Sequence, residues 1–289
     1  MNKSVKLLLI ICFFTALPAF AQTQLNTKGL FTFVRVLPIP SDFEIGPGQI
    51  NKDGSSFFVG LTDGDLENME DLHSDVYRVN VTSDVNAIPI TGLEIPNAID
   101  SLRFFQASAS DNDAYIVFVV NAWAGWNDNE LAIVKRQPSG AFGGMRMLTE
   151  VNKEHFSDAY PWLSGDANRL YFSQDFKLMY SERSSPDSLF SSPKPVDFVG
   201  DVQLEIVSAW LPPDEKSIFL LANNRIYKST RKSTTEPFSF PSLWTDEFKD
   251  FYFVAGLSFA PDKKTMYIYH SDETSQHILQ YQLSKGKAW

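Results

Sequence analysis

Cysteine is nearly absent from the sequence: the only one among the 289 residues is Cys12, in an apolar stretch near the N-terminus. Two lysines precede the apolar run 7–17, and a small-x-small cleavage pattern ends at Ala21. We therefore expect residues 1–21 to be a secretory signal peptide. The apolar run is shorter than the roughly 20 residues that span a bilayer, so no membrane span is expected after cleavage.

The predicted mature chain, residues 22–289, then contains no cysteine, which excludes disulfide bonds and a thiol nucleophile. An exported protein without disulfides needs a large hydrophobic core instead. The 268 residues that remain after removal of 21 from 289 can build one, because 44% of the sequence is hydrophobic. We expect one domain over residues 22–289, located in the periplasm or outside the cell.

Signatures of catalysis and metal binding are also missing. The sequence has no GxSxG, P-loop, HExxH or GxGxxG segment, and its four histidines lack the spacing of zinc ligands. We therefore expect no metal and no cofactor. Without the leader, 23 basic residues face 35 acidic ones, a formal net charge of −12, which argues against nucleic acid and anionic membranes as partners.

A repeated pattern of strand, polar turn and strand is what the sequence does contain. It is clearest in residues 157–174 and recurs, with more or less variation, in four other segments: 48–60, 104–120, 209–222 and 258–270. A period of about 50 residues indicates a propeller. Aligning the polar turns pairs five aspartates at intervals of 58, 55, 48 and 48 residues: Asp53, Asp111, Asp166, Asp214 and Asp262. A sixth blade would need a divergent repeat that is not found.

Each repeat predicts a β-propeller blade of four antiparallel strands. Aromatic second strands follow the turns at 57–58, 115–118, 170–172, 218–219 and 266–269, and third strands are predicted at 76–79, 130–134, 178–181, 225–228 and 278–281. Residues 30–36 form a further β-branched and aromatic run that precedes the first repeat. We expect this N-terminal strand to pair with the last blade, 255–283, and to close the ring.

The repeats resemble a known family. Segments such as SDAYPWLSGDANRLYFSQ and LSFAPDKKTMYIYHSDE are similar to the WD40-like β-propeller repeats of bacterial exported proteins, the type seen in the TolB propeller. Ala260-Pro261-Asp262-Lys263-Lys264 is the best match to the family's turn, with Lys263 in place of its glycine. The resemblance implies the fold over residues 45–283 and leaves the function open, since such repeats occur in scaffolds, binding proteins and enzymes.

A ring of acids is the first candidate site. Propellers bind ligands mostly at one mouth of the central channel, and an acid precedes the innermost strand of every repeat: Glu44, Asp100, Asp158, Glu205 and Asp250. Such carboxylates suit a hard cation or an acid and base pair for glycoside cleavage. Acids are also common at strand-entry turns of an acidic protein, and this interpretation stays open.

A second candidate is the segment 121–129, NAWAGWNDN. Trp123 and Trp126, with amides around them, would suit stacking on the face of a sugar, and Trp162, Trp210 and Trp244 would extend such a platform. Packing of these tryptophans under loops is the alternative.

Together these features predict an exported, non-enzymatic propeller that binds a protein or carbohydrate ligand at the channel mouth. The alternative is a glycoside hydrolase or lyase, which would require carboxylates from residues such as Glu44, Asp158 and Glu205 to lie about 5–10 Å apart in a cleft.

Overall fold

The computed structural model describes residues 29–37, 39, 44–63, 73–81, 87–89, 102–122, 129–272 and 275–284. The predicted signal peptide, 1–21, lies outside these ranges. Within them, no helix combines the length and the apolar composition needed to cross a membrane.

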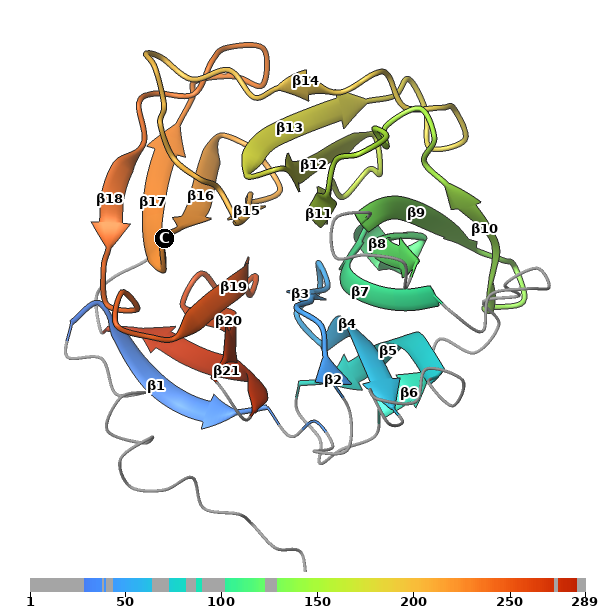
Figure 1. Cartoon of the computed structure of the whole chain (residues 1–289), viewed down its shortest axis with the longest axis horizontal. Coiled ribbons are helices and arrows are strands. Elements are labelled where there is room, and N and C mark those ends of the chain that lie inside the picture. The colour runs from blue at the N-terminus through green and yellow to red at the C-terminus, as the bar shows by residue number, and fades with distance from the viewer. Residues whose placement is uncertain are drawn as a thin grey trace, which may run out of the picture.

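The strands form five antiparallel sheets arranged in a ring, which confirms the predicted five-bladed β-propeller (Figure 1). The blades are numbered along the chain as follows. Blade 1 contains β2 (Glu44–Ile45), β3 (Gln49–Ile50), β4 (Ser56–Asp63), β5 (His73–Asn80) and β6 (Ala87–Pro89). Blade 2 contains β7 (Leu102–Ala109), β8 (Tyr115–Ala122), β9 (Asn129–Arg136) and β10 (Phe142–Met147), with a short 3-10 helix, Asp111–Asp113, after β7. Blade 3 contains β11 (Asp158–Leu163), β12 (Arg169–Gln174), β13 (Lys177–Glu182) and β14 (Lys194–Pro195). Blade 4 contains β15 (Ser208–Trp210), β16 (Ser217–Ala222), β17 (Arg225–Thr230) and β18 (Ser242–Thr245), and blade 5 contains β19 (Phe253–Phe259), β20 (Thr265–Ser271), β21 (Gln276–Leu283) and β1 (Phe31–Val36).

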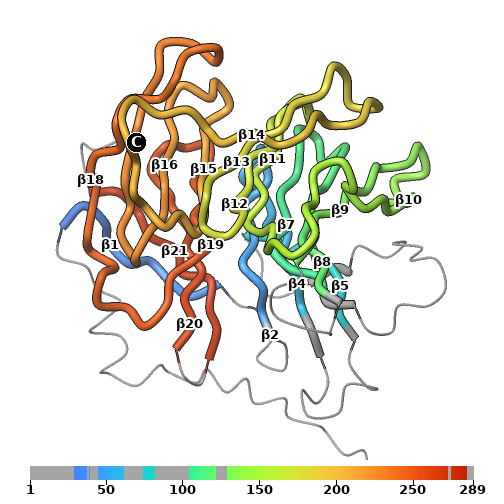
Figure 2. Tube along the Cα trace, turned by 45° about the horizontal axis from the view of Figure 1, so that its top comes forward, coloured from blue at the N-terminus to red at the C-terminus, as the bar shows by residue number. Residues whose placement is uncertain are grey.

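The N-terminal strand closes the ring, as predicted. β1 pairs antiparallel with β21, with Phe31 opposite Leu283, and in both views it lies beside the C-terminal strands (Figures 1 and 2). Phe31 is 1% exposed and packs its ring against Trp244, Phe248 and Tyr281. The first strand is therefore held both by its ladder and by an aromatic cluster of the last two blades.

The five polar turns share one hydrogen-bond pattern. The first residue of each turn accepts from the backbone N–H three positions later, and these first residues are Asn51, Ser110, Ser164, Pro212 and Ala260. Aspartate stands two positions later in four blades and accepts from the backbone two residues on: Asp53, Asp166, Asp214 and Asp262. In blade 2 this position is Asn112. The predicted alignment through Asp111 was therefore wrong by one residue, because sequence alone does not show where that turn begins.

The next position of every turn is left-handed: Gly54, Asp113, Ala167, Glu215 and Lys263 all have φ between +51° and +80°. Only the first is glycine, the residue for which this conformation is free of side-chain strain. Three of the other four, Asp113, Ala167 and Glu215, are also buried, and two of these carry a carboxylate. Asp113 and Glu215 thus stand at the turn position where the WD40-like repeats described above have glycine.

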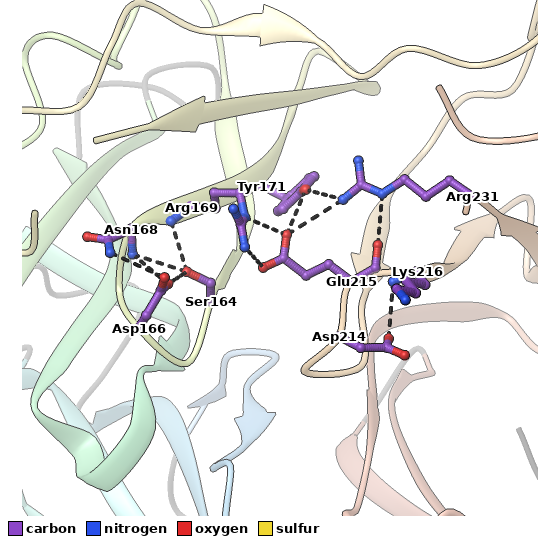
Figure 3. Close-up of polar contacts among 9 residues, drawn as sticks. All are labelled: Ser164, Asp166, Asn168, Arg169, Tyr171, Asp214, Glu215, Lys216 and Arg231. Carbon is purple, nitrogen blue, oxygen red and sulfur yellow. Dashed lines mark hydrogen bonds and ion pairs between the residues drawn. The ribbon is translucent and has the colours of Figure 1, made fainter. Parts of the chain in front are cut away.

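Glu215 lies at the centre of a buried polar network between blades 3 and 4 (Figure 3). Its two carboxylate oxygens accept from Arg169 at 2.7 and 2.8 Å, and Tyr171 donates its hydroxyl to one of them at 3.0 Å. Arg231 lies 3.7 Å from the same carboxylate and donates to the Glu215 carbonyl at 2.8 Å. The network joins β12 of blade 3 to the turn of blade 4 and to Arg231, the residue after β17.

The innermost strands carry a recurrent bulge. The ladder of β7, β11 and β19 shifts register at Gln106, Tyr160 and Gly256, and all three residues have positive φ. Tyr160 of blade 3 packs against a hydrophobic cluster built from blades 1 and 5. The bulge thus brings this ring of blade 3 into contact with blades on the other side of the propeller.

Candidate functional site

One end of the propeller, here called the hairpin end, is built from the hairpins that join second and third strands and from the starts of the innermost strands. Each hairpin bonds to the beginning of the next blade around the ring. The five contacts are Ser74 to Phe104, Asn129 to Ser157, Phe176 to Ile206, Asn224 to Val254 and Gln276 to Ile45. The opposite end carries the five polar turns and is called the turn end.

Asp158 is a buried carboxylate at the hairpin end. It opens β11, and its oxygens accept from the Gln174 amide at 2.8 Å and from the backbone N–H of Lys153 at 3.2 Å. Burial raises the pKa of this carboxyl to about 6, against the lowering effect of the two hydrogen bonds. Its acidic neighbours are Asp175 and Glu130, whose charges raise the pKa further. Asp158 is thus held in place and titrates close to neutrality.

The other predicted acids have different surroundings. Glu205 and Asp250 are exposed on the segments that lead into β15 and β19. Glu44 opens β2, but its side chain lies outside the described residues, as does the whole of Asp100. Among the described residues no three acidic or histidine side chains come together as metal ligands do. The closed ring of five carboxylates therefore stays a prediction.

The predicted tryptophan platform is not extended by the three tryptophans downstream. Trp162 and Trp210 are buried in the core between blades 3, 4 and 5, and Trp244 packs against the same cluster. These rings serve blade packing, the alternative considered from the sequence. Trp123 and Trp126 lie outside the described residues.

Three exposed aromatic side chains at the hairpin end were missed by the sequence reasoning. Phe176 forms the tip of the β12–β13 hairpin and is 56% exposed, while Tyr252 and Phe253, at the start of β19, are 69% and 40% exposed. Phe176 also has a φ of +63°, an uncommon conformation for a bulky residue. The available signals were an aromatic residue inside a two-residue hairpin turn and the run 251–253, FYF, at the point where a strand begins.

Comparison with known proteins shows likeness in fold. No family model and no curated protein matches the chain. Among solved structures, a glycosyl hydrolase from Bacteroides ovatus superposes with a TM-score of 0.53 at 11% identity, over 90% of this chain and 95% of that one. A putative TolB from Agrobacterium tumefaciens gives 0.47 at 12% identity, over 80% and 71%. A puromycin hydrolase gives 0.48 at 11% identity, and this chain, matched over 89% of its residues, covers 40% of that one.

At 11% identity, the Bacteroides ovatus match shows that the two chains share the propeller fold over nearly their whole length. Fold likeness of this kind does not transfer an activity.

Proposed function

We propose that this chain is a non-enzymatic binding module whose hairpin end takes a protein or glycan ligand. The observation that carries the proposal is the set of three exposed aromatic side chains, Phe176, Tyr252 and Phe253, spread over blades 3 and 5 at that end. Flat rings with large apolar area suit both a pyranose face and the side chains of a protein partner. The exposed carboxylates of Glu205 and Asp250 lie on the neighbouring segments and supply acceptors for hydroxyl or ammonium groups.

The conformation of Phe176 supports a role beyond packing. A bulky side chain in the left-handed region costs about 1–2 kcal/mol relative to glycine, yet this ring gains little burial in return. The hairpin turn sets this conformation, since Asp175 and the equivalent Asn223 and Asn224 of blade 4 also have positive φ. The choice of phenylalanine there, in place of the asparagine or glycine that such turns favour, supports contact with another molecule.

The test is a titration of the full chain against a panel of soluble oligosaccharides and peptides by isothermal titration calorimetry. We expect saturable binding of at least one member, weakened about fivefold or more by Phe176→Ala or by the double variant Tyr252→Ala/Phe253→Ala. Leu243→Ala is the matched control, because Leu243 is 54% exposed on the outermost strand of blade 4. The absence of binding by every member, or equal affinity in all variants, would contradict the proposal.

A glycoside hydrolase or lyase is the second candidate. The raised pKa of Asp158, about 6, favours it, because a general acid for glycoside cleavage needs such a carboxyl group. Against it, both oxygens of Asp158 already accept hydrogen bonds from the protein. Hydrolysis of a panel glycan that is abolished by Asp158→Asn would establish this second function in place of the first.

We also propose that the chain is exported with loss of residues 1–21. Expression in a bacterial host with sequencing of the mature N-terminus tests this point: a first residue of Gln22 supports it, and an intact cytoplasmic chain contradicts it.

A further inference from the structure

The centre of the turn end holds a lysine that reaches across the ring. Lys52 belongs to the turn of blade 1, yet its ammonium lies 4.2 Å from the ring centroid of Trp162 on the innermost strand of blade 3. Asp111 in the turn of blade 2 and Glu215 in the turn of blade 4 are the charges that act on it. A group with neighbours in blades 2, 3 and 4 lies close to the axis of the propeller.

A buried donor without an acceptor lies beside this ammonium. The indole N–H of Trp162 is buried, with the whole residue 1% exposed, and has no hydrogen-bond partner. Within the described part of the chain, the Lys52 ammonium makes a contact with the indole ring but no hydrogen bond or ion pair. Buried donors are almost always satisfied in folded proteins, so the unpaired indole N–H of Trp162 calls for an acceptor. Lys52 is partly exposed, so a ligand from solvent can reach its ammonium.

Neither carboxylate that acts on Lys52 is paired with it among the described residues. Glu215 is engaged by Arg169 and Arg231, and Asp111 is exposed. A carboxylate beside Lys52 could accept from both the ammonium and the indole N–H.

We propose that Lys52 and Trp162 form a binding site for a small carboxylate at the turn end of the central axis. This site lies among the polar turns, whereas Phe176, Tyr252 and Phe253 lie at the hairpin end. The carboxylate replaces the contact of the ammonium with the indole face by a charge-assisted hydrogen bond.

The protonation of Lys52 gives the site a pH signature. Burial lowers the pKa of this amine to about 8, although the carboxylates of Asp111 and Glu215 oppose the effect. A bound carboxylate favours the charged amine and so raises the pKa. Binding therefore takes up a fraction of a proton near pH 8, and the affinity falls as the pH rises above that value.

The experiment is a titration of the full chain with sodium acetate, followed through the indole resonances of the six tryptophans in a 1H–15N spectrum. The Trp162 resonance is assigned by its loss in Trp162→Phe. We expect saturable movement of this resonance at constant ionic strength, and no saturable movement with sodium chloride. Glucuronate compared with glucose, and a tripeptide with a free or an amidated C-terminus, show which source of carboxylate the site prefers.

The variants separate binding from folding. Lys52→Gln is expected to weaken acetate at least tenfold, Lys52→Arg to keep it within a few fold, and Lys249→Gln, at an exposed lysine paired with Asp246, to change nothing. Calorimetry near pH 8 in two buffers of different ionisation enthalpy should show proton uptake that is lost in Lys52→Gln. Equal acetate affinity in the wild type and Lys52→Gln, or a Trp162 resonance that acetate does not move, would overturn the proposal.

Discussion

Replacement of Glu215 by glutamine tests whether the network in Figure 3 holds blades 3 and 4 together. The substitution keeps the shape of the side chain and removes its charge. Three partners then lose the carboxylate they contact: the Arg169 guanidinium, the Tyr171 hydroxyl and the Arg231 guanidinium. The Glu215 side chain is 2% exposed and that of Arg231 8%, so water does not replace the lost partner at either position.

The size of the effect follows from this burial. Removing one member of a buried ion pair typically costs about 3–5 kcal/mol. Arg169 keeps 31% of its side chain in solvent, so part of its loss is recovered by water, and we expect a cost near the lower limit, about 3 kcal/mol. For a domain of this size that corresponds to a decrease in Tm of roughly 6–12 °C.

Urea and thermal denaturation followed by circular dichroism measure this change. The matched control is Asp246→Asn, which breaks an exposed pair with Lys249 and should change the free energy of unfolding by no more than about 0.5 kcal/mol. A double-mutant cycle with Arg169→Met should give a coupling energy of about 1 kcal/mol or more. A loss below about 1 kcal/mol in Glu215→Gln, or additive effects in the cycle, would refute the argument that the network joins the two blades.

The remaining predictions concern ring closure, turn strain and pH. Phe31→Ala should destabilise the chain by about 3–5 kcal/mol in urea denaturation, whereas Val34→Ala on the same strand, 45% exposed, should cost less than about 1 kcal/mol; similar costs would contradict closure by β1. Lys263→Gly should raise the free energy of unfolding by about 0.5–1 kcal/mol, because it removes a side chain from a left-handed position. Gly54→Ala should lower it, since the added Cβ would lie 2.8 Å from Pro261. The reverse order in Tm would refute the role of turn strain. Burial raises the folded-state pKa of Asp158 to about 6, above its unfolded value of about 3.9, so its contribution to stability is present below pH 4 and is lost as the pH rises through 6. Asp158→Asn should therefore flatten the fall in the free energy of unfolding between pH 4 and 7, and an unchanged pH profile would contradict this assignment.

The architecture could be predicted from the sequence because the same local pattern recurs in every blade. The turn around Asp262 and the strand that follows it each depend on neighbouring residues, so comparison of the repeats finds them. The second and third strands of all five blades contain the predicted segments and extend beyond them, and β1 pairs with the last blade as predicted. The one misaligned turn, at Asp111, is the turn that forms a short 3-10 helix.

The functional residues were harder to predict because they depend on contacts between distant segments. Nothing beside Lys52 in the sequence indicates that it lies over Trp162, and nothing beside Glu215 indicates two arginine partners. The sequence suggested either a sugar-stacking platform or blade packing for Trp162, and neither interpretation placed it under Lys52, since repetition does not show which side of a strand faces the axis. Exposure of Phe176 and Tyr252 likewise depends on how the loops of neighbouring blades leave them uncovered.

Hydrogen exchange of the full chain, with and without a panel member that binds it and carries no carboxylate, tests the location of ligand binding most directly. The account predicts protection at the hairpin end, in residues 174–177, 222–225 and 249–253, with the five polar turns unchanged. Protection confined to the polar turns or to the outermost strands, with these three segments unaffected, would contradict the proposal that the hairpin end is the binding surface.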